Sequence, residues 1–136
     1  MTPTAILESA LYVTDLAAAE AFYRDVLGLE FIARVEGRHA FFRCGEGVLL
    51  LFNAGATEVP PLADAKLPVP PHGARGGGHL CFAATAAEID QWKVRLVANG
   101  VAVEADFEWP QGGRSIYFRD PSGNSLEFAE PRIWGL

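Results

Sequence analysis

Cysteine is scarce in this sequence, and long apolar runs are absent. The two cysteines, Cys44 and Cys81, are too few for a disulfide framework and do not form a CxxC metal motif. The densest apolar run, Val48 to Phe52, is far too short to span a bilayer. The first four residues also lack the charged and apolar regions of a signal peptide. We therefore expect a cytoplasmic protein that does not enter a membrane.

An excess of basic residues is missing as well. Lys and Arg together number 11 against 17 Asp and Glu, which gives a net charge of −6. A chain without a basic stripe is not expected to bind nucleic acid. Half of the residues are apolar and 21% are charged, a composition that excludes intrinsic disorder. The 136 residues suit one domain with an ordinary hydrophobic core.

The first part of the chain predicts a strand, a helix and three further strands. Alternating apolar residues indicate a strand over 5–13, and a stripe with helical spacing follows from Asp15 to Leu27. Asp15 suits the N-cap of this helix, and Gly28 suits a left-handed residue at its end. The three short strands are expected at 30–35, 39–44 and 48–52.

The same order of elements is then predicted a second time. A strand over 79–84 precedes the capping box Thr85-Ala86-Ala87-Glu88, which opens a helix that stops at Asn99 and Gly100. The strands that follow are expected at 101–107, 115–119 and 125–129. Between the two patterns, residues 53–78 hold five prolines and three consecutive glycines, which indicates a linker or a long active-site loop.

The two patterns are related as an internal repeat. A shift of 76 residues superimposes Arg38 on Arg114, Phe42 on Phe118, Arg43 on Arg119, Gly47 on Gly123 and Phe52 on Phe128. This predicts an α+β fold of two tandem βαβββ modules, 5–54 and 77–130, joined by the loop 55–76. Arg38 and Arg114 become equivalent, and the ordinary role for both is pairing with acidic neighbours.

Three ionisable residues share one face of the predicted sheets. Side chains alternate along a strand, so Glu8, His79 and Glu127 point away from the helix layer. One His and two carboxylates from different strands can ligate a divalent metal. The same shift pairs Glu127 with Leu51, which cannot ligate. A solvated Glu and a structural His are the ordinary alternatives.

Other polar residues are candidates for contact with a substrate. His72 and Arg75 lie in the Pro/Gly-rich loop and are expected either to reach over the site to a substrate anion or to face solvent. Tyr12 shares the parity of Glu8, and Cys81 that of His79, so both can line the same face. We expect Cys81 to be an inert buried thiol and not a nucleophile.

Three segments carry a family resemblance: Glu8 to Gly28, Gly78 to Phe82, and Tyr117 to Phe128 with its Asp-Pro-x-Gly-Asn form. In them the chain resembles the vicinal-oxygen-chelate superfamily, which contains glyoxalase I, the bleomycin and fosfomycin resistance proteins, methylmalonyl-CoA epimerase and the extradiol dioxygenases. The resemblance implies paired modules whose curled mixed sheets form a cup around a metal or ligand. It also implies metal ligands on the first and last strands of each module.

Carried onto this chain, the resemblance implies one divalent ion held by Glu8, His79 and Glu127. Leu51 stands where glyoxalase I has a fourth, carboxylate ligand, so positions for water and substrate stay open. The more anionic set favours Mn²⁺, Fe²⁺ or Mg²⁺, and Zn²⁺ and Ni²⁺ also fit.

The resemblance implies a metal-dependent enzyme that chelates neighbouring oxygens of a small substrate, as a lyase, isomerase, transferase or dioxygenase. The alternatives are a metal-free protein that binds an antibiotic or other small molecule, and a structural dimer without a ligand. We expect a homodimer, because eight short strands leave sheet edges that need covering. The modules can pair within one chain or swap between two chains.

Overall fold

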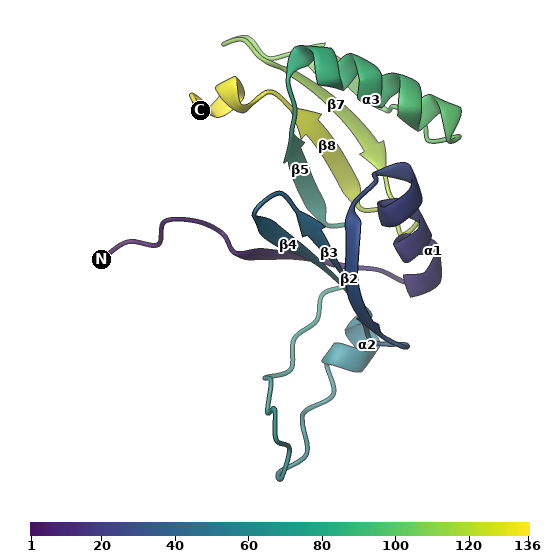
Figure 1. Ribbon diagram of the computed structural model, residues 1–136, viewed down its shortest axis with the longest axis vertical. Helices are drawn as coiled ribbons and strands as arrows, with labels where there is room; N and C mark the ends of the chain where they lie inside the picture. The colour runs from purple at the N-terminus through teal and green to yellow at the C-terminus, as the bar shows by residue number, and fades with distance from the viewer. The chain divides into compact units, whose positions relative to one another are not determined.

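A computed structural model describes residues 1–136, which form two compact units, Met1–Gly76 and Gly77–Leu136 (Figure 1). Each unit holds one four-stranded mixed sheet with a helix against it. The predicted α+β fold with repeated βαβββ order is confirmed. No helix combines the length and the hydropathy that a bilayer crossing requires.

The first unit has the strand order β1-β4-β3-β2, with β1 parallel to β4 and the other neighbours antiparallel. Its strands are β1 (Glu8–Tyr12), β2 (Glu30–Val35), β3 (His39–Cys44) and β4 (Gly47–Phe52). Of the three strands that follow the helix, β2 and β3 have the predicted bounds and β4 begins one residue earlier than predicted. The parallel pairing of first and last strand places the residues of β1 and β4 side by side on the same two faces of the sheet.

One helical segment covers the sheet of the first unit. The α-helix α1 (Leu16–Ala21) continues as the π-helix η1 (Phe22–Val26), where the single predicted helix was expected. The Asp15 carboxylate caps its start by accepting from an amide of the first turn at 2.9 Å. Tyr23 is fully buried, and its ring centroid lies 6.1 Å from that of Phe42 on β3. This contact defines which face of the sheet belongs to the core.

The second unit repeats this arrangement with the order β5-β8-β7-β6. Its elements are β5 (His79–Ala83), α3 (Ala86–Ala98), β6 (Ala105–Glu108), β7 (Arg114–Arg119) and β8 (Ser125–Ala129). The predicted capping box is present: Thr85 and Glu88 each bond to the backbone amide of the other. Trp92 of α3 stacks on Phe128 of β8 at 4.4 Å between ring centroids, so the face of β8 that carries Phe128 is the core face.

The structure differs from the sequence prediction in several places. The first strand spans Glu8–Tyr12 and not the expected 5–13. The strand expected from residue 101 begins only at Ala105, because the Val101 amide bonds to the Leu96 carbonyl and closes the end of α3. A short helix α2 (Ala54–Thr57) and a 3₁₀ helix η2 (Pro131–Trp134) were not expected. Both are single turns too short to show an apolar period. Beyond α2, residues 58–76 contain no helix or strand.

Candidate functional site

The second unit brings two of the predicted metal ligands together. His79 opens β5 and Glu127 lies on β8, the strand parallel to β5. Glu127 pairs laterally with Cys81 and Tyr117, so these side chains share the face opposite to the α3 core. The His79 Nε2 atom lies 3.4 Å from Glu127 Oε2. Glu127 is only 5% exposed, which makes its carboxylate expensive to leave without a partner.

The Asp-Pro-x-Gly-Asn turn holds His79 in place. The Asn124 side chain accepts from the Gly78 amide at 2.7 Å, and the Ser125 amide donates to the Gly78 carbonyl at 2.9 Å. Asp120 in turn accepts from the Asn124 side chain at 2.8 Å. The turn therefore anchors the start of β5 beside β8, one residue before His79.

The contacts of His79 define which ring nitrogen carries the proton. Nδ1 lies 3.0 Å from the Ser125 carbonyl oxygen, which can only accept, so Nδ1 is the donor. In the neutral ring Nε2 then turns a lone pair toward Glu127 Oε2. Two acceptors at this distance suit the ligands of a shared cation, and a backbone carbonyl on the other ring nitrogen is the usual support of a metal-binding His.

Glu127 provides a second observation on whether this donor set fits a cation. Its Oε1 atom is buried and has no hydrogen-bond partner. An orphaned carboxylate oxygen costs free energy unless a positive charge lies near it. The donor set of His79 and Glu127 therefore fits a divalent ion.

Two further groups flank this pair. Burial and, next, the nearby Glu127 carboxylate raise the pKa of the Cys81 thiol to about 12. Burial, and second the hydrogen bond to the Glu127 carboxylate, also raise the pKa of the Tyr117 phenol to about 12. As a whole residue Cys81 is exposed and not buried as predicted, because β5 is an edge strand of its sheet, although neighbouring groups shield the thiol itself. Its protonated thiol agrees with the predicted lack of nucleophilic character.

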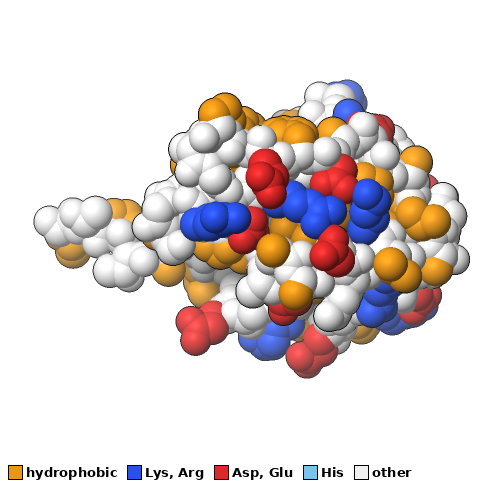
Figure 2. Space-filling view, turned by 90° about the horizontal axis from the view of Figure 1, so that it is seen from above, with side chains coloured by type: hydrophobic (Ala, Val, Ile, Leu, Met, Phe, Trp, Pro, Cys, Tyr) orange, Lys and Arg blue, Asp and Glu red, His pale blue; other side chains and the backbone are white.

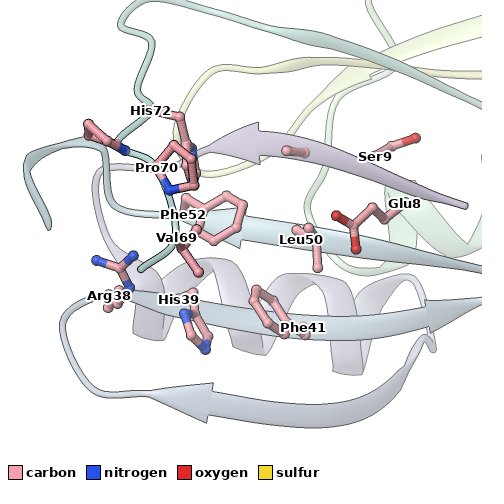
Figure 3. A pocket seen from close by; sticks show the side chains of 12 residues that line it. Glu8, Ser9, Arg38, His39, Phe41, Leu50, Phe52, Val69, Pro70 and His72 are labelled. Atoms are coloured by element: carbon pink, nitrogen blue, oxygen red, sulfur yellow. The ribbon is translucent and has the colours of Figure 1, made fainter. Parts of the chain in front are cut away.

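Glu8 lies in the first unit, on the face of β1 that points away from α1. It lines a pocket of about 700 Å³ that lies between the sheet face and residues 69–72 (Figure 3). The strands contribute Glu8, Ser9, Ala10, His39, Phe41, Leu50 and Phe52, and the adjoining segments contribute Arg38, Val69, Pro70, Pro71 and His72.

The two loop residues predicted to contact a substrate differ in position: His72 lines the pocket and Arg75 does not. The Nδ1 atom of His72 lies 2.6 Å from the Tyr12 hydroxyl, and its ring packs on Phe52 at 4.6 Å between centroids. Tyr12 thus supports a loop residue that lines the pocket. Arg75 instead forms an exposed ion pair with Glu58 of the same segment.

Sequence reasoning missed His39 of β3. Its ring stacks on Phe41 at 4.0 Å and an interplanar angle of 8°, and its Nδ1 atom is buried without a partner. Burial and then the charge of Arg38 lower the pKa of His39 below its usual value. The alternation of the predicted strand 39–44 already places His39 and Phe41 on one face, which is the signal that could have revealed it.

The predicted role of Leu51 is wrong, and Leu50 takes its place. Glu127 pairs with Tyr117 just as Leu50 pairs with Phe41, so the shift between the last strands is 77 residues and not 76. Four residues separate the paired Arg43 and Val48, whereas five separate the equivalent pair Arg119 and Ser125, which moves every side chain of β8 by one position. Leu51 is fully buried on the core face.

No three His, Cys, Asp or Glu residues form a metal-binding group in the structure. Glu8 belongs to the first unit, whereas His79 and Glu127 belong to the second. The complete set of three ligands therefore stays a prediction, of which the second unit assembles two members.

Comparison with known proteins defines the class. The sequence matches the Glyoxalase/Bleomycin resistance protein/Dioxygenase superfamily over residues 5–128, and the chain belongs to this family. It is 50% identical to lactoylglutathione lyase from Agrobacterium tumefaciens, with a TM-score of 0.93 and all of both chains covered.

Two further relatives are more distant. Glutathione transferase FosA of Serratia marcescens is 29% identical over 121 residues, which are 86% of this chain and 74% of that protein. A glyoxalase/bleomycin resistance protein/dioxygenase from Nocardioides is 25% identical, with a TM-score of 0.72, over 96% of this chain and 85% of the other. The predicted family and an enzyme of the glyoxalase type are thereby confirmed.

Proposed function

We propose that this chain is a divalent-metal-dependent enzyme in which Glu8, His79 and Glu127 hold one ion against a small-molecule substrate. Glu8 occupies in β1 the place that His79 occupies in β5, at the start of the strand that runs parallel to the last strand of its sheet. The proposed ligand set thus takes Glu8 from the first unit and His79 and Glu127 from the second.

The observation that carries this proposal is the close approach of His79 to Glu127 in the second unit, together with one carboxylate oxygen that has no partner. His79 Nε2 and Glu127 Oε2 are 3.4 Å apart, and Glu127 Oε1 is buried without a partner. A divalent cation satisfies all three atoms at once. Two carboxylates and one imidazole suit Mn²⁺, Fe²⁺ or Mg²⁺ best, and Zn²⁺ or Ni²⁺ also bind such a set.

A bound ion would act as a Lewis acid on two neighbouring oxygens of the substrate. The chain supplies the rest of the site. The Ser125 carbonyl orients His79, and the protonated Tyr117 and Cys81 lie beside Glu127 without competing as ligands. Leu50 offers no fourth ligand, so a bound ion would keep coordination positions for the substrate.

The names of two relatives, lactoylglutathione lyase and glutathione transferase, support a thiol adduct as the first substrate class to test. Catechols and fosfomycin-type epoxides are the comparison substrates. The second candidate function is metal-free sequestration of a small molecule, which the largely apolar pocket of the first unit favours.

Metal content separates the two functions. Protein purified without chelator should hold about one divalent ion per chain, and Glu127→Gln or His79→Ala should lose it. Glu8→Gln should weaken the metal affinity by at least about tenfold, as expected for a lost ligand. Glu46→Gln, on an exposed turn, is the matched control and should retain the metal.

Catalysis is then assayed with the metal-loaded protein on the three substrate classes. Turnover that disappears on chelation and returns with metal supports the proposed enzyme. Full metal retention in His79→Ala, or turnover that chelation leaves unchanged, would contradict it.

A further inference from the structure

The ionisable residues of the pocket in the first unit lie at its two ends. Glu8 pairs with Val48 and His39 with Phe52 on the shared strand β4, four residues further along. This separates the two ends by about 13 Å. Between them the floor is apolar and aromatic, formed by Leu50, Phe41 and Phe52 (Figure 3).

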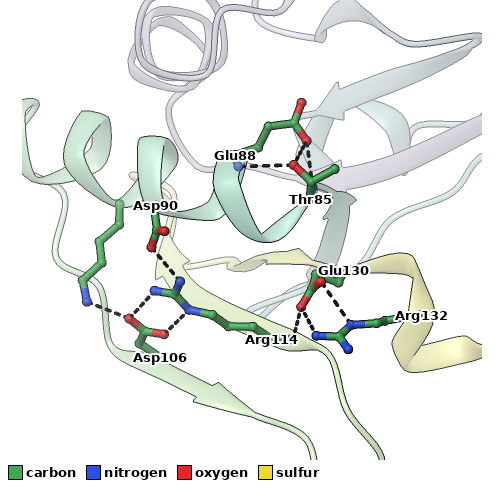
Figure 4. A network of polar contacts seen from close by, with 8 residues as sticks. Thr85, Glu88, Asp90, Asp106, Arg114, Glu130 and Arg132 are labelled. Carbon is green, nitrogen blue, oxygen red and sulfur yellow. Dashed lines mark hydrogen bonds and ion pairs between the residues drawn. The ribbon is translucent and has the colours of Figure 1, made fainter.

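The end of the pocket opposite Glu8 carries a cation without an acidic partner. Arg38 Nη1 donates to the Ala56 carbonyl oxygen at 2.9 Å, and no carboxylate forms an ion pair with this guanidinium. Its repeat-equivalent Arg114 donates to both Asp90 and Asp106 at 2.7 Å (Figure 4). The expected acidic pairing therefore holds for Arg114 and not for Arg38, whose charge remains available to a ligand.

His39 adds a hydrogen-bond donor beside this cation. Burial and, second, the positive charge of Arg38 lower the pKa of His39 and so disfavour a second proton on the ring. A buried N–H without a partner is rarer than a buried acceptor, so the unpartnered Nδ1 is the bare nitrogen and Nε2 carries the hydrogen. With Nδ1 buried, His39 Nε2–H and the Arg38 guanidinium are the donors that these two residues offer to a ligand.

We propose that this pocket binds an elongated small molecule with an apolar or aromatic body and a carboxylate end. The body lies on Phe41 and Phe52, and the carboxylate accepts from Arg38 and His39. In the metal-free protein the Glu8 carboxylate repels an anion, so the charged end of the ligand points away from it. The identification of this ligand as the enzyme's substrate rests on the proposed function; the binding itself does not.

Binding is measured on the full chain after removal of divalent metal by chelation. Calorimetry compares 4-phenylbutyrate with 4-phenylbutanamide, which has the same length and no charge. The carboxylate should bind at least about tenfold more tightly, because hydrogen bonds to charged groups are the stronger ones. Arg38→Gln should remove this difference, and Arg38→Lys should restore part of it.

Two variants locate the contact. His39→Leu should weaken carboxylate binding severalfold, and His39→Gln, which keeps a donor, should recover it. Arg43→Gln is the matched control, since Arg43 lies on the same strand β3, is half exposed and does not line the pocket. It should bind both compounds as the unchanged protein does.

Equal affinity for the carboxylate and the amide, no binding of either at millimolar concentration, or an equal loss in Arg43→Gln and Arg38→Gln would overturn the inference. The outcomes that would refute the proposed function are different from these. Carboxylate binding by a protein that takes up no metal would refute the metal-dependent enzyme alone, and metal uptake without carboxylate selectivity would refute this inference alone.

Discussion

Asp106 is the residue around which the surface charges of the second unit are organised. It accepts from Arg114 at 2.7 Å and from Lys93 at 2.6 Å (Figure 4). Acidic and basic side chains lie interspersed on one face of the molecule (Figure 2). The Arg114 hydrogen bonds, followed by that of Lys93, hold the pKa of Asp106 well below its ordinary value.

Because this pKa is lower in the folded state, the ionised Asp106 stabilises the fold at pH values above its unfolded pKa of about 4. This stabilisation is lost as the pH falls through the folded pKa. Asp106→Asn should lower the free energy of unfolding by about 1–2 kcal/mol at pH 7. Urea denaturation at pH 7 and pH 3 should show this difference shrinking in acid. Asp64→Asn, on the exposed loop, should change nothing; a constant Asp106→Asn effect at both pH values would contradict the assignment.

Substitutions at Leu50 and Leu51 test which side chains of β4 face the core. Leu51 is fully buried on the core face, whereas Leu50 lines the pocket. Leu51→Glu should destabilise the protein by at least about 3 kcal/mol more than Leu50→Glu, because it places an unpaired charge in the core. Thermal and urea denaturation measure both. The opposite order would show that the repeat shift of 76 residues holds after all.

At the scale of elements, α3 depends on its first turn. Thr85 Oγ1 accepts from the Glu88 amide, and Glu88 accepts from the Thr85 amide at 2.7 Å (Figure 4). Thr85→Ala should cost about 1 kcal/mol of the free energy of unfolding, measured by urea denaturation. Thr2→Ala, in the exposed N-terminal segment, is the control. No loss in Thr85→Ala would mean that packing of Trp92 alone sets the stability of α3.

At the scale of the whole molecule, the exposed edges of the sheets predict association with a partner. All six residues of the edge strand β2 are exposed, and three of them are the large apolar residues Phe31, Ile32 and Val35. Exposed apolar edges are rarely left uncovered. We predict a homodimer of twice 14.7 kDa, measured by light scattering after gel filtration. Ile32→Lys should shift it toward monomer, and a monomeric wild-type protein at every concentration would contradict the prediction.

The sequence by itself determined the elements and their repetition, because those signals are local. The capping box at Thr85, the N-cap at Asp15 and the alternation that puts Glu127 opposite the core each depend on residues a few positions apart. The Asp-Pro-x-Gly-Asn turn likewise carries its own hydrogen bonds and places His79 at the start of its strand.

Only the tertiary structure decided which equivalent residues keep equivalent roles. The connection from Arg119 to Ser125 is one residue longer than that from Arg43 to Val48, so Leu50, and not Leu51, is the counterpart of Glu127. No local sequence pattern reveals how this insertion shifts the strand. Arg38 and Arg114 match in sequence, yet only Arg114 meets carboxylates, which come from α3 and β6. Such partners are distant in the chain, and packing alone brings them within hydrogen-bond distance.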